Sequence, residues 1–81
     1  MARLRAEGEV TAITYPGAGP NPAVQVHVHT TAGVPVTLCF LGRRDIRCIQ
    51  VGSRILFDAV HSANRPGLAY NPRYTVLEQP S

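Results

Sequence analysis

The segment Ala23–Thr30 reads AVQVHVHT, and apolar and polar side chains alternate from Val24 to His29. Its three valines would share one face of an extended strand, and the polar residues would share the other face. Such alternation is typical of a strand that packs against a core on one side and meets water on the other. The segment Pro35–Leu41, PVTLCFL, repeats the pattern after a short turn that contains Gly33. The sequence therefore predicts a β-hairpin over residues 23–41.

Three further segments have the pattern of strands. Residues 3–14 alternate less regularly and are interrupted at Gly8 and again at Ala12–Ile13, which predicts a long first strand with a bend or bulge. Residues 53–60 place Ile55, Phe57 and Ala59 on one side of a strand, and residues 68–78 also read as a strand. We expect these two segments to form the last two strands.

The segments between the predicted strands carry the signals of loops. Glycine and proline are frequent in residues 15–22, and residues 61–67 are mostly polar, so both predict loops. Residues 42–52 are basic and place Ile46 and Ile49 three positions apart. That spacing predicts either a short helical turn or an irregular connector between the third and fourth strands.

The order of these elements favours an all-β fold in which five strands form one barrel. A flat sheet would leave two open edges, which promote aggregation. A bent first strand that serves both halves of the sheet removes most of the open edge, as in the five-stranded oligonucleotide-binding (OB) fold barrel. An SH3-like barrel is the next interpretation, and a sandwich fits less well because it usually needs seven or more strands. Pro72 cannot donate a hydrogen bond to a neighbouring strand, so we expect a bulge or an edge position there.

The chain has 81 residues, which is enough for one domain. We expect residues 1–81 to form a single OB-fold domain with a core of about residues 3–78 and a frayed tail at residues 79–81. The first nine residues lack the apolar stretch of a secretion signal, and no apolar run approaches the ~20 residues of a membrane helix. We therefore expect a cytoplasmic protein that does not engage membranes.

All eight basic residues are arginine, and the formal net charge is +3. Guanidinium groups form paired hydrogen bonds with phosphates and stack on bases, which favours a polyanionic partner. A general preference for arginine, with a small excess that aids solubility, explains the composition equally well. Composition alone leaves both interpretations open.

Four segments together match the pattern of a known family. They are GEV at residues 8–10, Gly33 followed by VTLCFLGRR at residues 36–44, Ile49 with VGSRI at residues 51–55, and NPRY at residues 71–74. Through them the stretch Glu7–Glu78 resembles bacterial OB-fold nucleic-acid-binding domains, most of all the small stand-alone domains of the actinobacterial type. It is similar, more distantly, to the wedge domain of the RecG helicase and to the anticodon-binding OB domains of tRNA synthetases. The resemblance implies a non-catalytic nucleic-acid-binding module.

The barrel, the arginines and the resemblance together predict binding of single-stranded DNA or RNA. In OB barrels the outer face of the second and third strands and the flanking loops hold the nucleic acid. The candidate binding residues are Gln25, His27, His29, Thr37, Arg43, Arg44, Arg47, Arg54, Tyr70 and Arg73. Few rings are available for base stacking, because Tyr74 is expected to pack at the end of the barrel. We therefore expect weak binding that is largely independent of sequence.

Other chemistry has little support in the residues. His27 and His29 share a strand face, but a metal site needs further ligands, and no Cys-x-x-Cys or His-x-x-x-His spacing is present. We expect Cys39 and Cys48 to be free thiols in a reducing compartment and not a redox pair. The five acidic residues are scattered, and none forms an obvious catalytic pair with a histidine. We expect no metal, no cofactor and no enzymatic activity.

A protein-interaction or assembly module on the same type of barrel is the alternative function. Leu41 and Leu56 are apolar at positions where the alternation points outward. A dimer that covers the face of His27 and His29 would favour this alternative, and an open face would favour nucleic-acid binding.

Overall fold

The computed structural model describes residues 3–80, and all regular secondary structure in this range is β-strand. The strands are β1 (Arg3–Thr14), β2 (Ala23–Thr30), β3 (Pro35–Leu41), β4 (Arg54–His61) and β5 (Leu68–Glu78). The all-β prediction is confirmed. The predicted ranges match these strands, except that β4 begins and ends one residue later than expected.

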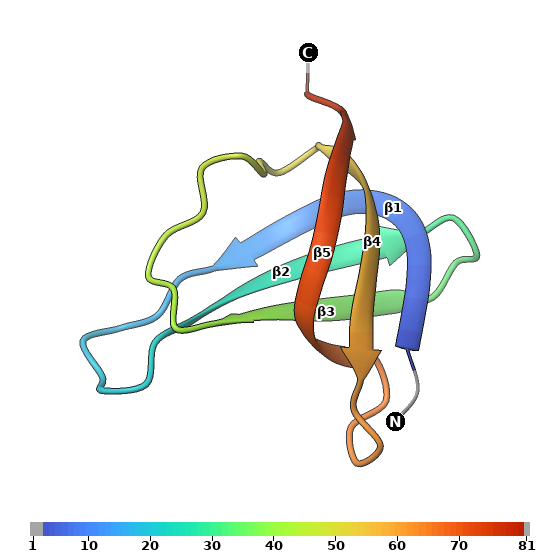
Figure 1. The fold of residues 1–81 in the computed structure, drawn as a ribbon. Helices are drawn as coiled ribbons and strands as arrows, with labels where there is room; N and C mark the ends of the chain where they lie inside the picture. The colour runs from blue at the N-terminus through green and yellow to red at the C-terminus, as the bar shows by residue number, and fades with distance from the viewer. Residues whose placement is uncertain (1–2, 81) are drawn as a thin grey trace.

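The five strands form one sheet that closes on itself in a ring, in the order β1-β2-β3-β5-β4 and back to β1 (Figure 1). β1 closes the ring because its residues 3–9 pair with β4 and its residues 8–14 pair with β2. β3 and β5 run parallel and pair only between Thr37–Cys39 and Leu68–Tyr70. The first strand is visibly curved in Figure 1, as the sequence predicted.

Gly8 lies at the bend of β1 and pairs with two strands, opposite Thr30 of β2 and Ile55 of β4. A Cβ atom at this position would lie 2.5 Å from the carbonyl oxygen of His29 and 2.7 Å from Cγ1 of Val28. Real Cβ atoms do not approach other atoms so closely. Glycine is therefore required at the bend because the backbone of β2 passes directly over it.

Two irregularities in the pairing fall where the sequence predicted them. The register between β1 and β2 shifts between Val10 and Ala12, close to the predicted interruption. The register between β4 and β5 shifts between Asp58 and Val60, where Asn71 and Pro72 of β5 have no partner on β4. Asn71 adopts a left-handed conformation with φ of 52°. Pro72 thus lies in a bulge, where its missing N–H costs no ladder hydrogen bond.

The interior of the ring is filled almost entirely by aliphatic side chains and two phenylalanines. The buried apolar residues are Val10, Val24, Val26, Val28, Val36, Leu38, Phe40, Ile46, Ile49, Ile55, Phe57, Ala59 and Ala69. Burying each of the larger side chains stabilises the fold by about 1.5–3 kcal/mol. The predicted valine-lined interior is confirmed.

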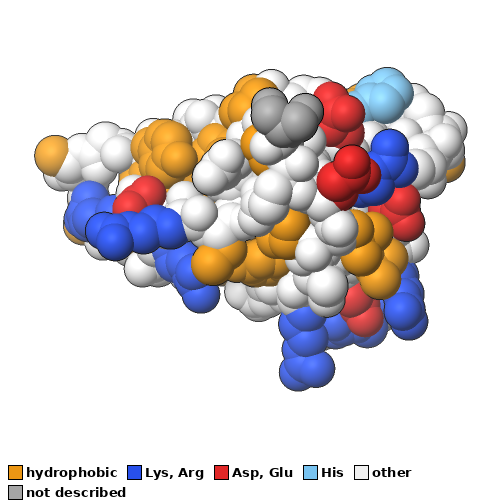
Figure 2. Space-filling view, turned by 90° about the horizontal axis from the view of Figure 1, so that it is seen from above, with side chains coloured by type: hydrophobic (Ala, Val, Ile, Leu, Met, Phe, Trp, Pro, Cys, Tyr) orange, Lys and Arg blue, Asp and Glu red, His pale blue; other side chains and the backbone are white. Residues whose placement is uncertain are grey.

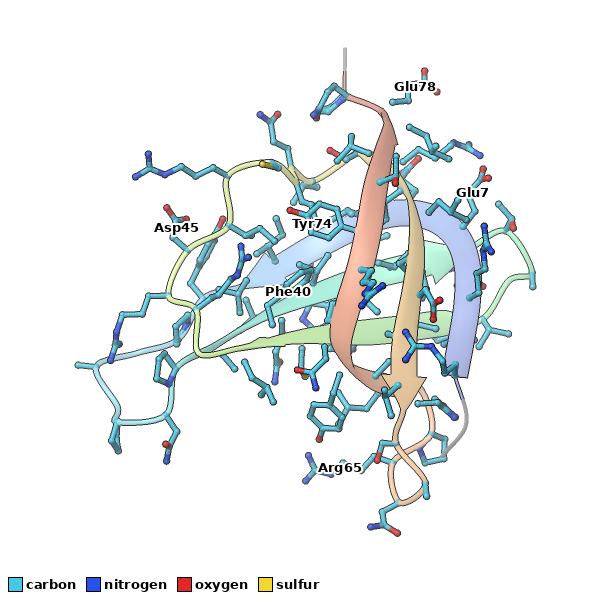
Figure 3. The ribbon with its side chains drawn as sticks, in the orientation of Figure 1. Glu7, Phe40, Asp45, Arg65, Tyr74 and Glu78 are labelled. Atoms are coloured by element: carbon cyan, nitrogen blue, oxygen red, sulfur yellow. The ribbon has the colours of Figure 1, made fainter. Side chains whose placement is uncertain are left out.

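Residues 42–53 connect β3 to β4 without a helix, so the irregular form of the predicted connector is observed. Two of its side chains, Ile46 and Ile49, are only 4% and 2% exposed and belong to the core. Next to this cluster, Tyr74 packs edge-to-face on Phe40 with ring centroids 5.6 Å apart (Figure 3). The connector therefore adds two core side chains although it has no regular structure.

Hydrogen bonds attach the end of the connector to the last residues of the chain. Oγ of the fully buried Ser53 accepts the N–H of Gln50 at 3.0 Å and donates to Oε1 of Gln79 at 3.1 Å. Nε2 of Gln79 donates to the carbonyl oxygen of Cys48 at 3.4 Å. We expected residues 79–81 to fray; these bonds instead hold Gln79 on the connector, and Ser81 lies outside the described residues.

We expect Gly8→Ala to lower the free energy of unfolding by about 1–3 kcal/mol, because the added methyl group collides with backbone atoms that cannot move independently. Gly17→Ala is the matched control, since a Cβ at Gly17 meets no atom within 4 Å. Its unfolding free energy should stay within about 0.5 kcal/mol of the wild type. Urea titrations followed by circular dichroism measure both values. Equal stability of the two variants would contradict the close approach at Gly8.

Candidate functional site

The outer surface of β2, β3 and β5 carries a continuous set of polar side chains, which we call the β2–β3 face. It consists of the partly buried Gln25, His27, Thr37 and Tyr70, which surround the position of Cys39, whose side chain is only 4% exposed. His27 pairs with Thr37 across the two strands, and Gln25 pairs with Cys39. Tyr70 is the partner of Cys39 on β5, so its side chain shares this face. The structure thus brings together four of the predicted binding residues on three strands.

His27 lies on β2 and is held from both sides, by β1 and by β3. Its Nε2 lies 2.9 Å from Oγ1 of Thr14 on β1, and its Nδ1 lies 3.2 Å from Oγ1 of Thr37 on β3. A hydroxyl can donate to or accept from an imidazole nitrogen, so both ring nitrogens have partners in either tautomer. The imidazole ring is therefore fixed between the neighbouring strands.

The sequence prediction gave no role to Arg65, which lies in the loop between β4 and β5 (Figure 3). Burial raises the pKa of the Cys39 thiol, and the positive charge of Arg65 partly opposes this increase. The loop of Arg65 lies beside β3, because the N–H of Thr37 donates to the carbonyl oxygen of Gly67 at 2.6 Å. The parallel pairing of β3 with β5 thus brings this loop to the end of the β2–β3 face where β5 begins.

Three predicted arginines follow β3 on the connector, and they are held in different ways. Arg44 donates from Nη1 and Nη2 to the carbonyl oxygens of Gly17 and Gly19, at 3.1 Å and 2.9 Å. Arg43 lies over the ring of Phe40, with its Cζ 6.0 Å from the centroid. Arg44 thus ties the loop between β1 and β2 to the connector, while Arg43 remains near the end of β3.

Arg47, the third of these arginines, forms a local ion pair with Asp45, with Nε 3.2 Å from Oδ2. The Arg47 side chain is 90% exposed, so this pair is worth little in water and leaves most of its donors accessible. Figure 2 shows basic side chains gathered with an acidic one at the left end of the molecule, where the connector lies. We call Arg43, Arg47 and the loop-bound Arg44 the connector rim.

The structure places His29, Arg54 and Arg73 away from this group. His29 is exposed at the far end of β2, where it lines a hollow of about 390 Å³ together with Arg54. Nη1 of Arg54 donates to Oε2 of Glu7 at 3.1 Å. Arg73 lies on β5 opposite Asp58 of β4. These three residues lie apart from the β2–β3 face, because the closed ring, and not the order of the strands in the chain, decides which strands are neighbours.

The remaining polar groups offer little additional chemistry. Cys39 is buried, Cys48 is exposed, and both are free thiols. Burial raises the pKa of Tyr74, and the neighbouring Cys48 raises it further while Arg43 lowers it. Within residues 3–80, no group of three or more His, Cys, Asp or Glu side chains is placed to hold a metal ion. The same part of the chain has no helix with the length and apolarity to cross a membrane.

No protein-family model, curated protein or solved structure matched the chain. The function is therefore inferred from the geometry and charge of the β2–β3 face and the connector rim.

We expect Arg44→Ala to release the loop of residues 15–22, because two hydrogen bonds to its carbonyl groups disappear. The heteronuclear ¹H–¹⁵N Overhauser effects of the loop amides should fall, because the loop moves faster, while the unfolding free energy should change by only about 0.5–1.5 kcal/mol. Arg47→Ala removes the same charge from the same connector without touching the loop and serves as the control. NMR relaxation measurements distinguish the two variants. Unchanged Overhauser effects in Arg44→Ala would contradict the anchoring.

Proposed function

We propose that this protein is an OB-type barrel that binds single-stranded nucleic acid on the β2–β3 face. The strand order, the bent β1 and the parallel contact of β3 with β5 support an OB-type topology. In that fold the second and third strands and the loops after the first and fourth strands bind oligonucleotides. Here those loops are residues 15–22, held by Arg44, and residues 62–67, which include Arg65.

The observation that carries the proposal is a polar face that contains a fixed imidazole ring and has arginines at both ends. Bases stack on the flat side chains of His and Tyr, so His27 and Tyr70 would each hold a base. Arg65 at one end and Arg43 and Arg47 at the other would contact the phosphates on either side. The sugar-phosphate chain would then run across β2 and β3 between the two basic ends.

The small number of flat side chains on the β2–β3 face limits the affinity for nucleic acid. Each stacked base contributes about 1–3 kcal/mol, and the face offers only two rings. The contacts to phosphate carry no sequence information. We therefore propose weak binding, with a dissociation constant on the order of 1–100 µM at physiological salt, and little preference among sequences. DNA and RNA share the base and phosphate groups that these residues would contact.

An assembly module remains the second candidate function, and one observation favours it. Leu41 is 56% exposed at the end of β3, so this large apolar side chain is available for a contact with another protein. Leu56, the other residue that the sequence singled out, is partly buried on β4. Sedimentation at several concentrations detects self-association, and Leu41→Ser should abolish it if Leu41 forms the contact.

The nucleic-acid proposal is tested by fluorescence anisotropy with a labelled oligo(dT) and a labelled oligo(U) of about 12 nucleotides. The three or four phosphates contacted at the β2–β3 face alone should make the logarithm of the association constant fall with the logarithm of salt concentration, with a negative slope whose magnitude is at least roughly 2 to 3. Tyr70→Ala should weaken binding about tenfold, because one stacked base is lost. Arg65→Ala should weaken it about three- to tenfold and make the slope shallower by about 0.7.

Arg54→Ala is the control for Arg65→Ala, because it removes the same charge from the far end of the ring, where Arg54 is paired with Glu7. Its affinity should remain within about twofold of the wild type. Absence of binding at low salt would exclude the proposal. Equal losses in Arg54→Ala and Arg65→Ala would mean that net charge alone attracts the nucleic acid and that the β2–β3 face has no special role.

A further inference from the structure

Three arginines surround a single carboxylate on the outer surface of β1, β4 and β5. Arg5 of β1 and Arg73 of β5 are the cross-strand partners of Asp58 on β4. Arg3 donates from Nε to Oδ1 of Asp58 at 2.9 Å. We call these four residues the β1–β4–β5 cluster. It is separate from the connector rim, and Figure 2 shows a second gathering of basic side chains around an acidic one at the lower right.

The cluster has more positive charge than its own carboxylate can balance. Three guanidinium groups face one carboxylate, which leaves an excess of two positive charges. Arg3 and Asp58 are 53% and 39% exposed, so water weakens their attraction. Within the described range, 3–80, neither Arg5 nor Arg73 forms an ion pair. Most of the guanidinium donors are therefore available to a further anion.

The surface around Asp58 is hollowed on both sides. One hollow of about 470 Å³ is lined by Arg3, Asp58 and Arg73, among others. A second of about 270 Å³ is lined by Arg5, Asp58 and Arg73, among others. Arg73 and Asp58 line both hollows and so form the wall between them. Each hollow is many times the ~30 Å³ that one molecule of liquid water takes up, so each can accept a hydrated phosphate group.

We propose that the β1–β4–β5 cluster binds two successive backbone phosphates of a nucleic-acid strand that continues from the β2–β3 face. This inference rests on the proposed function. Guanidinium groups form paired hydrogen bonds with phosphate oxygens, and Arg73 can reach a group in either hollow. Two adjacent basic hollows fit a repeating phosphate chain better than they fit a single anion.

The register of the sheet connects the two surfaces. Tyr70, at the edge of the β2–β3 face, is the cross-strand partner of Val60 on β4, and Val60 is the partner of Arg3 on β1. Neighbouring strands lie about 4.8 Å apart, so the backbones at Tyr70 and Arg3 are separated by roughly 10 Å across the sheet. A strand with one base stacked on Tyr70 would need to pass only over Val60 to reach the cluster.

The variant Asp58→Asn tests the proposal, because loss of a purely structural ion pair would not strengthen nucleic-acid binding. The Asp58 carboxylate repels phosphate and occupies one donor of Arg3, so Asp58→Asn should strengthen binding of a strand long enough to reach the cluster. For an oligo(dT) of about 12 nucleotides, we expect about two- to fivefold tighter binding and a salt slope steeper by about 0.7. An oligo(dT) of about 4 nucleotides fills only the β2–β3 face and should bind wild type and variant equally.

Glu9→Gln is the charge-matched control. It also raises the net charge by one, but Glu9 pairs with Arg54, four residues before Asp58 on β4 and so roughly 13 Å from it along the strand, beyond the screening distance at physiological salt. It should leave both affinities within about twofold of the wild type. Arg73→Ala should weaken binding of the long oligonucleotide at least threefold and leave the short one unchanged. If Asp58→Asn and Glu9→Gln change the affinities equally, the cluster is not a phosphate site and the proposal is wrong.

A second measurement separates this inference from the proposed function. Titration of the protein with inorganic pyrophosphate should shift the NMR signals of residues 3–5, 58–60 and 71–73, and Arg73→Ala should abolish the shifts. If pyrophosphate acts there while no oligonucleotide binds, the nucleic-acid proposals fail and only a site for small phosphates is left. If oligonucleotides bind but neither they nor pyrophosphate shift these signals, the cluster proposal alone fails. Displacement of pyrophosphate by a polyglutamate peptide at similar concentration would overturn it in favour of an acidic protein partner.

Discussion

The close contact between Gly8 and the backbone of β2 is the constraint on which the rest of the structure depends. It allows one strand to turn sharply enough to pair with β2 through one half and with β4 through the other. Without that turn the sheet would be open along β1 and β4, and the apolar side chains of β4 would have no opposite wall. The ring gives a chain of only 81 residues an interior that its valines can fill. It also removes most of the unpaired edge that would promote aggregation.

The same closure decides which polar residues become neighbours. Because β5 lies between β3 and β4, Tyr70 joins the surface of His27 and Thr37, while Arg73, three residues later, faces Asp58 on the other side of the bulge at Pro72. The connector contributes in two ways at once. Ile46 and Ile49 pack in the core, and Arg44 holds the loop after β1 at the end of the β2–β3 face. The strand neighbours that form both proposed contact surfaces are therefore set by the packing of the aliphatic core on the inner side of the same strands.

Much of the fold could be predicted from the sequence because the relevant signals are local. Alternation defined the strands, and Gly8 and Pro72 marked the bend and the bulge. The sequence did not decide whether the connector forms a helical turn or an irregular segment, because either form can bury two isoleucines three positions apart. The candidate site was harder to predict. The role of Arg44 depends on a contact with Gly17 and Gly19 across 27 and 25 residues, and the position of Arg65 depends on the parallel pairing of β3 with β5. Such long-range contacts leave no periodic signal in the sequence.

The most direct test of the account is the set of cross-strand nuclear Overhauser contacts of β1 in the isotopically labelled protein. Closure of the ring requires that Gly8 give contacts to both Thr30 and Ile55, and that Leu38 give contacts to Ala69 across the parallel pair. We expect all three sets in the same spectrum. If Gly8 contacted Thr30 but showed no contact to β4, the sheet would be open, and the surfaces on which both proposals rest would not exist in this form.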